Sequence, residues 1–139
     1  MIQIIAGEKG KGKTKLLLER VNKSIKSVNG NIVYLDKSKK HMYELNNKIR
    51  LINVSDFHIA NCDEFLGFLS GIVSQDNDLE EMYLDSFLTI AALKDDEICR
   101  VFEKLDLISE NYQVNFIISI SLNKSNLPEC VREKVIISL

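Results

Sequence analysis

The sequence is poor in cysteine and histidine, the side chains that most often hold a structural zinc ion. It contains three cysteines, Cys62, Cys99 and Cys130, and two histidines, His41 and His58, and none of them stand together at the spacing of a zinc motif. A zinc site is therefore not indicated. An odd number of widely spaced cysteines is typical of reduced thiols in a core, which favours a cytosolic protein.

Long apolar runs and a strong net charge are also missing. The longest apolar stretches, such as FIISI, have the length of a strand, and the formal net charge is −2 with no basic block outside the first loop. No membrane span is therefore expected, and a nucleic-acid partner is not indicated. The N-terminus enters a strand at once and carries no signal peptide, so we expect a cytoplasmic protein.

The chain does contain a regular alternation of apolar runs and helical patterns. Apolar β-rich runs predict strands at 2–6, 31–36, 48–54, 80–85, 114–121 and 134–139. Helical spacing predicts helices at 13–28, 62–73 and 94–111, and shorter ones after Asp36 and around Pro128. Asn29-Gly30 is expected to end the first helix, and Asn61 or Asp63 to cap the second.

Strands that alternate with helices in this way predict the α/β class. The expected architecture is a three-layer parallel sheet of about five strands with helices on both faces. The sequence has no repeat, no linker and no low-complexity segment. Residues 1–139 are therefore expected to form a single domain.

The most informative stretch is GEKGKGKT, residues 7–14, between the first strand and the first helix. It matches the pattern GxxxxGK[ST] at every fixed position, with a strand before it and a helix that begins within it. A glycine-rich turn lets successive backbone N–H groups converge on an anion, and the helix N-terminus adds its dipole. The candidate nucleotide-binding residues are Gly7, Glu8, Lys9, Gly10, Lys11, Gly12, Lys13, Thr14 and Lys15.

Two residues of this loop have specific expected roles. The Lys13 ammonium group can reach the β- and γ-phosphates, which makes it the first catalytic candidate, and the Thr14 hydroxyl can complete a Mg²⁺ shell. The expected ligands are therefore a nucleoside triphosphate, ATP, and Mg²⁺. The motif does not require Lys9, Lys11 and Lys15, whose simpler interpretation is that of solvated lysines.

The loop closely resembles the Walker A motif of the P-loop NTPase superfamily, and the order of the later elements loosely resembles its RecA-like ATPases. This resemblance implies a strand-end carboxylate that supports Mg²⁺, and Asp85 after MYLD is the metal candidate. It also implies a carboxylate that orients the attacking water. Ser86 stands where many of these ATPases have Glu, so Asp36 after IVYLD is the catalytic candidate, with Glu64 and Glu81 as weaker ones.

The same resemblance implies that strand 114–121 lies between the P-loop strand and the strand that ends at Asp85. Its polar end, Ser119 to Asn123, would then lie beside the γ-phosphate in a sensor position, although a strand running into a polar turn explains these residues equally. Motor ATPases of this class often form rings in which a neighbour donates an arginine. A homo-oligomer or protein partner is therefore an open expectation, with Arg132 as the candidate arginine.

Other branches of the superfamily fit less well. Glu8 stands where the partitioning ATPases have a second lysine, and four arginines without a lid insertion are few for a small-molecule kinase. A GTPase would use the stretch NKSN, residues 123–126, which nearly matches NKxD. Asn126 offers one acceptor where a carboxylate accepts from both guanine N–H groups, and no DxxG follows from Asp85.

The expected function is Mg-ATP binding by a RecA-like P-loop domain, with hydrolysis that is weak or depends on a partner. Two alternatives stay open beside it. The first is a nucleotide-binding switch or interaction module that does not hydrolyse ATP, favoured by the missing Glu after Asp85. The second is a divergent GTPase that uses the NKSN stretch.

Overall fold

Six strands form one sheet in which every pair of neighbours is parallel. The computed structural model describes residues 1–139, and the strand order is β3-β2-β4-β5-β1-β6. The strands are β1 (Ile2–Ala6), β2 (Asn31–Asp36), β3 (Arg50–Asn53), β4 (Leu79–Leu84), β5 (Asn115–Ile120) and β6 (Val135–Ser138). The predicted parallel α/β sheet is confirmed, with six strands where about five were expected. β5 lies between β1 and β4, as the resemblance implies.

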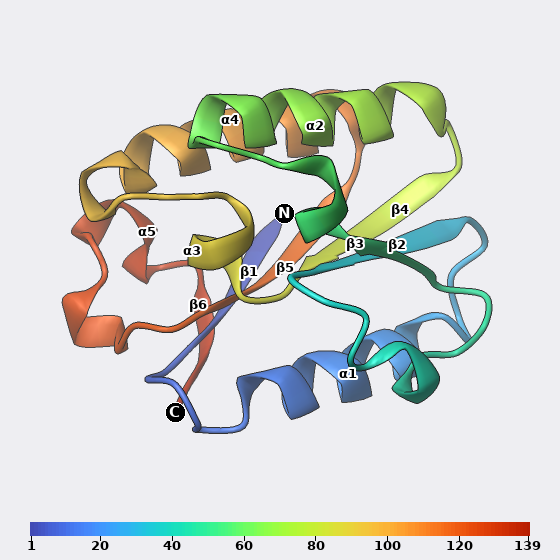
Figure 1. Ribbon diagram of the computed structural model, residues 1–139, viewed down its shortest axis with the longest axis horizontal. Coiled ribbons are helices and arrows are strands. Elements are labelled where there is room, and N and C mark those ends of the chain that lie inside the picture. Colours follow the sequence, from blue (N-terminus) through green and yellow to red (C-terminus); the bar gives the residue numbers. More distant parts are fainter.

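Helices cover both faces of the sheet, but unequally (Figure 1). One face carries α1 (Lys13–Ser24), whereas α2 (Cys62–Gln75) and α4 (Ile98–Tyr112) lie side by side on the other. The short elements are α3 (Phe87–Ile90), α5 (Glu129–Arg132), and the 3₁₀ turns η1 (Met42–Glu44), η2 (Val54–Phe57), η3 (Asp95–Glu97) and η4 (Lys124–Asn126). None of the helices combines the length and the apolar composition that crossing a membrane requires.

Residues of the central strands alternate between two cores, because successive side chains of a strand point to opposite faces. In β2, Ile32 and Tyr34 pack on the α1 side, whereas Val33 and Leu35 pack on the side of α2 and α4. The core on the α1 side has 10 buried residues and the other core has 28, so the larger share of apolar burial lies under α2 and α4. Burial on both faces explains why the strands appear in the sequence as continuous apolar runs.

The first helix ends earlier than Asn29-Gly30 predicts. α1 ends at Ser24, and the N–H groups of Ser27 and Val28 both bond to the Ser24 carbonyl in the turn that follows. The Ser24 hydroxyl donates to Glu81 of β4 at 2.8 Å, which fixes this end of the helix against the sheet. This contact anchors the last residue of α1 to the sheet, and the turn that follows it carries the chain to Asn29.

The structure also settles three details of the other helices. Asn61 is the N-cap of α2, since its side chain accepts from the Glu64 N–H at 2.9 Å. α4 begins at Ile98 rather than at residue 94, because the acidic residues before it form η3. No periodic pattern predicts α3, which is a single turn directly after Asp85.

The expectation of three reduced cysteines is wrong. Cys99 of α4 and Cys130 of α5 form a disulfide across 31 residues of sequence, with their Cα atoms 6.0 Å apart. Only Cys62 is a free thiol, and it is buried. The two paired cysteines have no motif spacing, and the packing of α5 against the start of α4 is what brings them together.

Candidate functional site

The loop of residues 7–14 joins β1 to α1 at the carboxyl edge of the sheet. Gly10 and Gly12 have φ angles of 87° and 93°, in the left-handed region that side chains with a Cβ atom rarely adopt. A Cβ atom at either position would meet nothing within 4 Å, so the backbone faces open space. The conformation therefore depends on these two glycines, and the space beside them is available to a ligand.

Lys13 begins α1 and points back along the loop. Its side chain is only 8% exposed, and its Nζ donates to the Glu8 carbonyl at 2.9 Å. Burial lowers the pKa of Lys13 below its usual value, and the negative charge of Asp85 opposes that shift. The ammonium group is thus held by the loop itself at the start of the helix, where an anion would also be favoured.

Asp85 is the residue that joins the loop to the sheet. It follows β4 directly and is buried, with 2% of its surface exposed. Its Oδ1 accepts from the Thr14 hydroxyl at 3.2 Å and from the Ser119 hydroxyl at 2.7 Å. The Ser119 oxygen in turn accepts from the Ser86 N–H at 2.9 Å. The structure thus brings together three residues that the sequence singles out from three separate segments: Thr14, Asp85 and Ser119.

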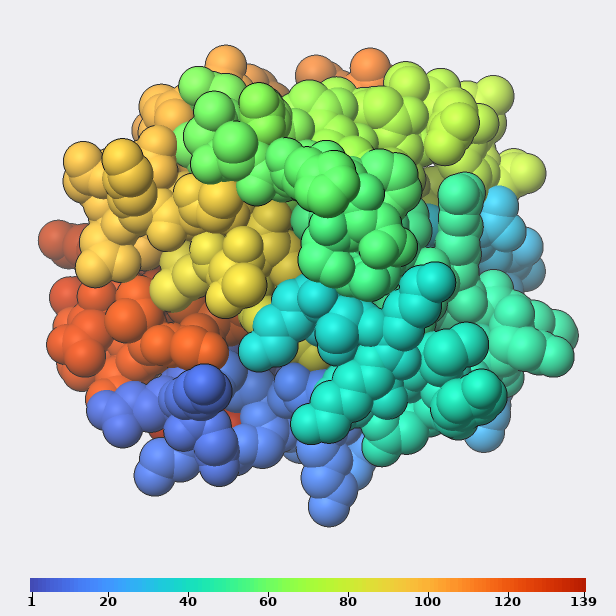
Figure 2. Space-filling view, viewed as in Figure 1, coloured from blue at the N-terminus to red at the C-terminus, as the bar shows by residue number.

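A cavity of about 410 Å³ opens between the loop and the ends of the strands. It is lined by Lys9, Gly10, Gly12, Lys13, Thr14, Lys37, Asp85, Ser86, Leu88, Thr89, Ser119 and Ser121. Three lysines face one carboxylate in this lining, so the cavity suits an anionic ligand. Figure 2 shows the segments that form it close together at the surface: the blue loop after β1, the cyan segment after β2 and the yellow segment after β4.

The arrangement of strands, loop and helices is shared with solved structures. A KaiC-like protein from the hyperthermophilic archaeon Pyrococcus horikoshii is similar with a TM-score of 0.59 and 21% sequence identity, over 87% of this chain and 61% of that one. The flagellar accessory protein FlaH from Methanocaldococcus jannaschii is similar with a TM-score of 0.56 and 17% identity, over 94% of this chain and 64% of that one. The fold is RecA-like.

This similarity lies in the fold and not in the sequence. No protein-family model matches the chain, and no curated protein matches it significantly. The chain also spans less than two thirds of the length of the two RecA-like neighbours. The RecA-like fold expected from the sequence is nevertheless confirmed, and Thr14, Asp85 and Ser119 meet at the carboxyl edge of its sheet.

The predicted residues do not all line the cavity. Four members of the loop set lie outside the lining: Gly7, Glu8, Lys11 and Lys15. The sequence prediction missed Lys37, Ser86, Leu88 and Thr89 as lining residues. Their positions in the chain could have indicated that they line the cavity. Lys37 follows the end of β2 and the other three follow the end of β4, at the edge of the sheet where the loop lies.

Asp36 ends β2 beside the cavity but is not part of its lining. Its side chain is buried, its Oδ1 accepts from the Lys37 N–H at 2.7 Å, and its Oδ2 has no hydrogen-bond partner. Burial raises the pKa of Asp36, and the charge of Asp85 raises it further. The two weaker candidates lie elsewhere: Glu64 accepts from the Ala60 N–H, and Glu81 accepts from Ser24 and Tyr83.

The residues considered for guanine recognition and for an arginine finger have partners within the chain. Asn123 donates to Glu8 Oε1 at 2.9 Å. Arg132 donates to the carbonyls of Leu127 at 2.8 Å and Ser125 at 3.2 Å. In this conformation both side chains stabilise the segment around η4.

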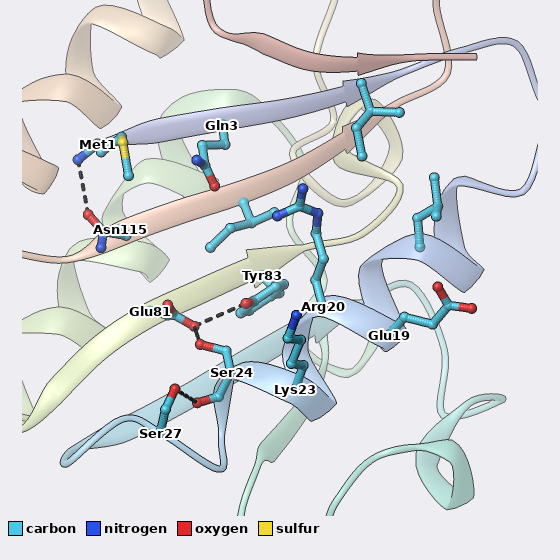
Figure 3. A pocket seen from close by; sticks show the side chains of 13 residues that line it. Met1, Gln3, Glu19, Arg20, Lys23, Ser24, Ser27, Glu81, Tyr83 and Asn115 are labelled. Carbon is cyan, nitrogen blue, oxygen red and sulfur yellow. Dashed lines mark hydrogen bonds between the residues drawn. The ribbon is translucent and has the colours of Figure 1, made fainter.

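A second cavity, of about 570 Å³, lies on the α1 face away from the loop (Figure 3). Arg20 and Lys23 of α1 border it on one side, and Glu81 and Tyr83 of β4 lie opposite. No residue of the glycine-rich loop lines it. The two cavities are therefore separate: Lys13, Thr14 and Asp85 line the smaller one, whereas the weaker candidate Glu81 lines the larger one.

Proposed function

We propose that this chain binds Mg-ATP in the cavity beside the glycine-rich loop and acts as a RecA-like ATPase with weak or partner-dependent turnover. The observation that carries the proposal is the contact between the Thr14 hydroxyl and Asp85 Oδ1, 3.2 Å apart. It joins the last residue of the loop motif to a carboxylate at the end of a non-adjacent strand. The RecA-like fold of the neighbours supports a role in nucleotide binding.

The residues present fit both ligands. The left-handed glycines leave the loop backbone open to phosphate oxygens, and Lys9, Lys13 and Lys37 supply positive charge around the cavity. In this proposal the N–H groups at the start of α1 and the Lys13 ammonium group hold the β- and γ-phosphates. Thr14 and Asp85 supply the oxygen atoms that a magnesium ion prefers. When bound, the ion would neutralise charge on the phosphates.

Hydrolysis would be an in-line attack by water on the γ-phosphorus. The new bond forms to the water oxygen, the bond to the bridging oxygen breaks, and ADP leaves with the electron pair. The chain contributes charge stabilisation through the loop and Lys13. Asp36 is the proposed carboxylate that positions the water and takes its proton. Because Asp36 is buried outside the cavity lining and Ser86 replaces the usual Glu, turnover is expected to be slow.

A non-hydrolysing switch is the second candidate, and the same two observations favour it. In that case the chain binds Mg-ATP without hydrolysing it and acts as an interaction module. A protein partner or a second copy of the chain then recognises the nucleotide-bound form. We further propose that residues 1–139 act as one P-loop domain. A GTPase function has less support than ATP binding, because the Asn123 amide that would recognise the guanine base donates a hydrogen bond to Glu8.

Calorimetric titration with a non-hydrolysable ATP analogue tests the binding proposal. We expect magnesium-dependent binding to the wild-type chain, much weaker binding of the GTP analogue, and a loss of at least tenfold in affinity in Lys13→Ala, or about 1.4 kcal/mol. Lys11→Ala is the matched control, since Lys11 belongs to the same loop but does not line the cavity. Tighter binding of the GTP analogue, or no binding of either, contradicts the proposal.

Steady-state phosphate release then separates the enzyme from the switch. An activity that disappears in Lys13→Ala identifies an ATPase, whereas binding of ATP without phosphate release identifies the switch.

Light scattering with and without the ATP analogue tests for an oligomer. A mass that stays monomeric with nucleotide counts against a ring in which Arg132 acts on a neighbour.

A further inference from the structure

The Asp85 carboxylate has a third side-chain partner that no part of the loop motif predicts. The Tyr34 hydroxyl donates to Asp85 Oδ2 at 2.8 Å, and both side chains are buried. Tyr34 lies in the middle of β2, the strand that pairs with β4. The Asp85 N–H also donates to the Leu35 carbonyl of β2 at 2.9 Å. β2 therefore holds Asp85 through both its backbone and its carboxylate.

The three donors divide between the two oxygens of the carboxylate. Thr14 and Ser119 both donate to Oδ1, and Tyr34 is the donor to Oδ2. A carboxylate held at one oxygen can still rotate about its bond to Cβ, whereas donors at both oxygens fix its plane. A buried carboxylate oxygen that loses its donor also loses stabilisation that water cannot replace. Tyr34 is thus the group whose loss would free the orientation of this carboxylate.

We propose that Tyr34 is a positioning residue for magnesium: its hydroxyl fixes the Asp85 carboxylate and so sets the affinity of the site for Mg²⁺. This inference rests on the proposed function, because it assigns a role to the carboxylate that supports the metal there. Tyr34 does not line the cavity and so acts through Asp85 rather than by contact with the nucleotide. Groups that orient a metal ligand commonly change metal affinity by about 10- to 100-fold when they are removed.

The structure offers a closely matched control in Tyr83. Tyr83 of β4 is the register partner of Tyr34, it is buried, and the two rings stack with centroids 6.1 Å apart and planes 11° apart. The Tyr83 hydroxyl, however, donates to Glu81 Oε1 at 3.0 Å, at the edge of the larger cavity (Figure 3). Tyr34→Phe and Tyr83→Phe therefore remove the same atom from the same stacked pair, and only one of the two touches Asp85.

The test is a Mg²⁺ titration of the binding of a fluorescent, non-hydrolysable ATP analogue to the wild-type chain and both variants. We expect Tyr34→Phe to raise the Mg²⁺ concentration at half-maximal effect about tenfold or more, and Tyr83→Phe to leave it within about twofold. The affinity for the analogue in EDTA should be unchanged in both variants, because neither tyrosine lines the smaller cavity beside the glycine-rich loop. In an Asp85→Asn background, Tyr34→Phe should have no further effect on the Mg²⁺ response.

The other outcomes contradict either this role of Tyr34 or the proposed function on which it rests. Equal responses of the two Phe variants would show that the hydroxyl at Asp85 has no special role. Affinity in EDTA that falls together with the Mg²⁺ response would make Tyr34 a residue of the fold rather than of the metal site. A wild-type chain that binds the analogue without any dependence on Mg²⁺, or not at all, overturns the proposed function itself. The wild-type titration therefore separates failure of the function from failure of the role given to Tyr34.

Discussion

Asp36 and Asp85 follow the register pair Leu35 and Leu84, so two buried carboxylates end neighbouring strands. Their hydrogen bonding differs. Asp85 accepts from three side-chain hydroxyls, whereas Asp36 accepts from the Lys37 N–H and leaves Oδ2 without a partner. Donors to a carboxylate stabilise its charged form, and burial without donors favours the neutral form. Negative charge on Asp36 is therefore poorly stabilised.

This difference predicts how stability depends on pH. The pKa of Asp36 is raised in the folded chain by burial and by Asp85, above the value of about 3.9 that an unfolded Asp has. Between these two values the folded chain holds more protons than the unfolded chain, so rising pH lowers the free energy of unfolding. The stabilisation is fully present below the unfolded pKa and is lost as pH rises through the folded pKa.

Asp36→Asn removes this titration. The free energy of unfolding of the variant minus that of the wild type should therefore increase as the pH is raised from acid toward neutral. Urea denaturation of both proteins across this range measures the difference, in which the other carboxylates cancel. A difference that stays constant with pH would show that the pKa of Asp36 is the same in the folded and unfolded chains.

Lys37 gives a second prediction, for nucleotide affinity. It lines the cavity with Lys9 and Lys13, although the loop motif does not include it. Lys37→Ala should weaken binding of the ATP analogue about fivefold, or roughly 1 kcal/mol, because one positive charge is removed from the wall of an anion site. Lys39→Ala is the matched control: it makes the same change of charge at an exposed position outside the lining. Equal effects of the two variants would mean that only the net charge matters.

The parts of the site that the sequence predicts are those in which local spacing determines geometry. The glycines, Lys13 and Thr14 lie within eight consecutive residues between a strand and a helix, so the pattern specifies their arrangement. Asp85 could be predicted because it ends an apolar strand, and parallel strands end at the same edge. The sheet itself follows from the alternation of apolar runs and helical periods.

The parts that the sequence does not predict depend on contacts between distant segments. Tyr34 sits in an apolar strand, where a tyrosine is expected to be a core aromatic, and only its register with β4 directs the hydroxyl to Asp85. The end of α1 contacts Glu81 of β4, which is 57 residues away from Ser24 in the sequence. The pairing of Cys99 with Cys130 depends on how α5 packs on α4. No local pattern contains these relationships.

Substitution of glycine by alanine is expected to have opposite effects on stability at two positions outside the loop. A Cβ atom at Gly30 would lie 2.0 Å from the Asp78 carbonyl oxygen, where β2 begins beside the start of β4. Gly30→Ala should therefore destabilise the fold by more than about 2 kcal/mol, since backbone must move to relieve the clash. Gly67 lies in α2 with nothing within 4 Å of such an atom, so Gly67→Ala should stabilise the fold by about 0.5–1 kcal/mol. Urea denaturation measures both, and effects of the same sign would contradict the local geometry.

The disulfide between Cys99 and Cys130 predicts how the protein responds to a reductant. It closes a loop of 31 residues between α4 and α5, and a loop of this length restricts the unfolded chain by about 3–4 kcal/mol. Reductant should lower the unfolding midpoint of the wild type and of Cys62→Ser, whose substituted thiol is the free one. It should have no effect on the Cys99→Ser/Cys130→Ser variant.

A thiol count in denaturant checks the pairing independently of stability. We expect one reactive thiol in the untreated wild type, that of Cys62, and three after reduction. Three thiols before reduction would mean that Cys99 and Cys130 are neighbours without a bond between them. In that case the unfolding midpoint should not respond to reductant, and noncovalent packing, including that of Val131 in the core, would hold α5 against α4.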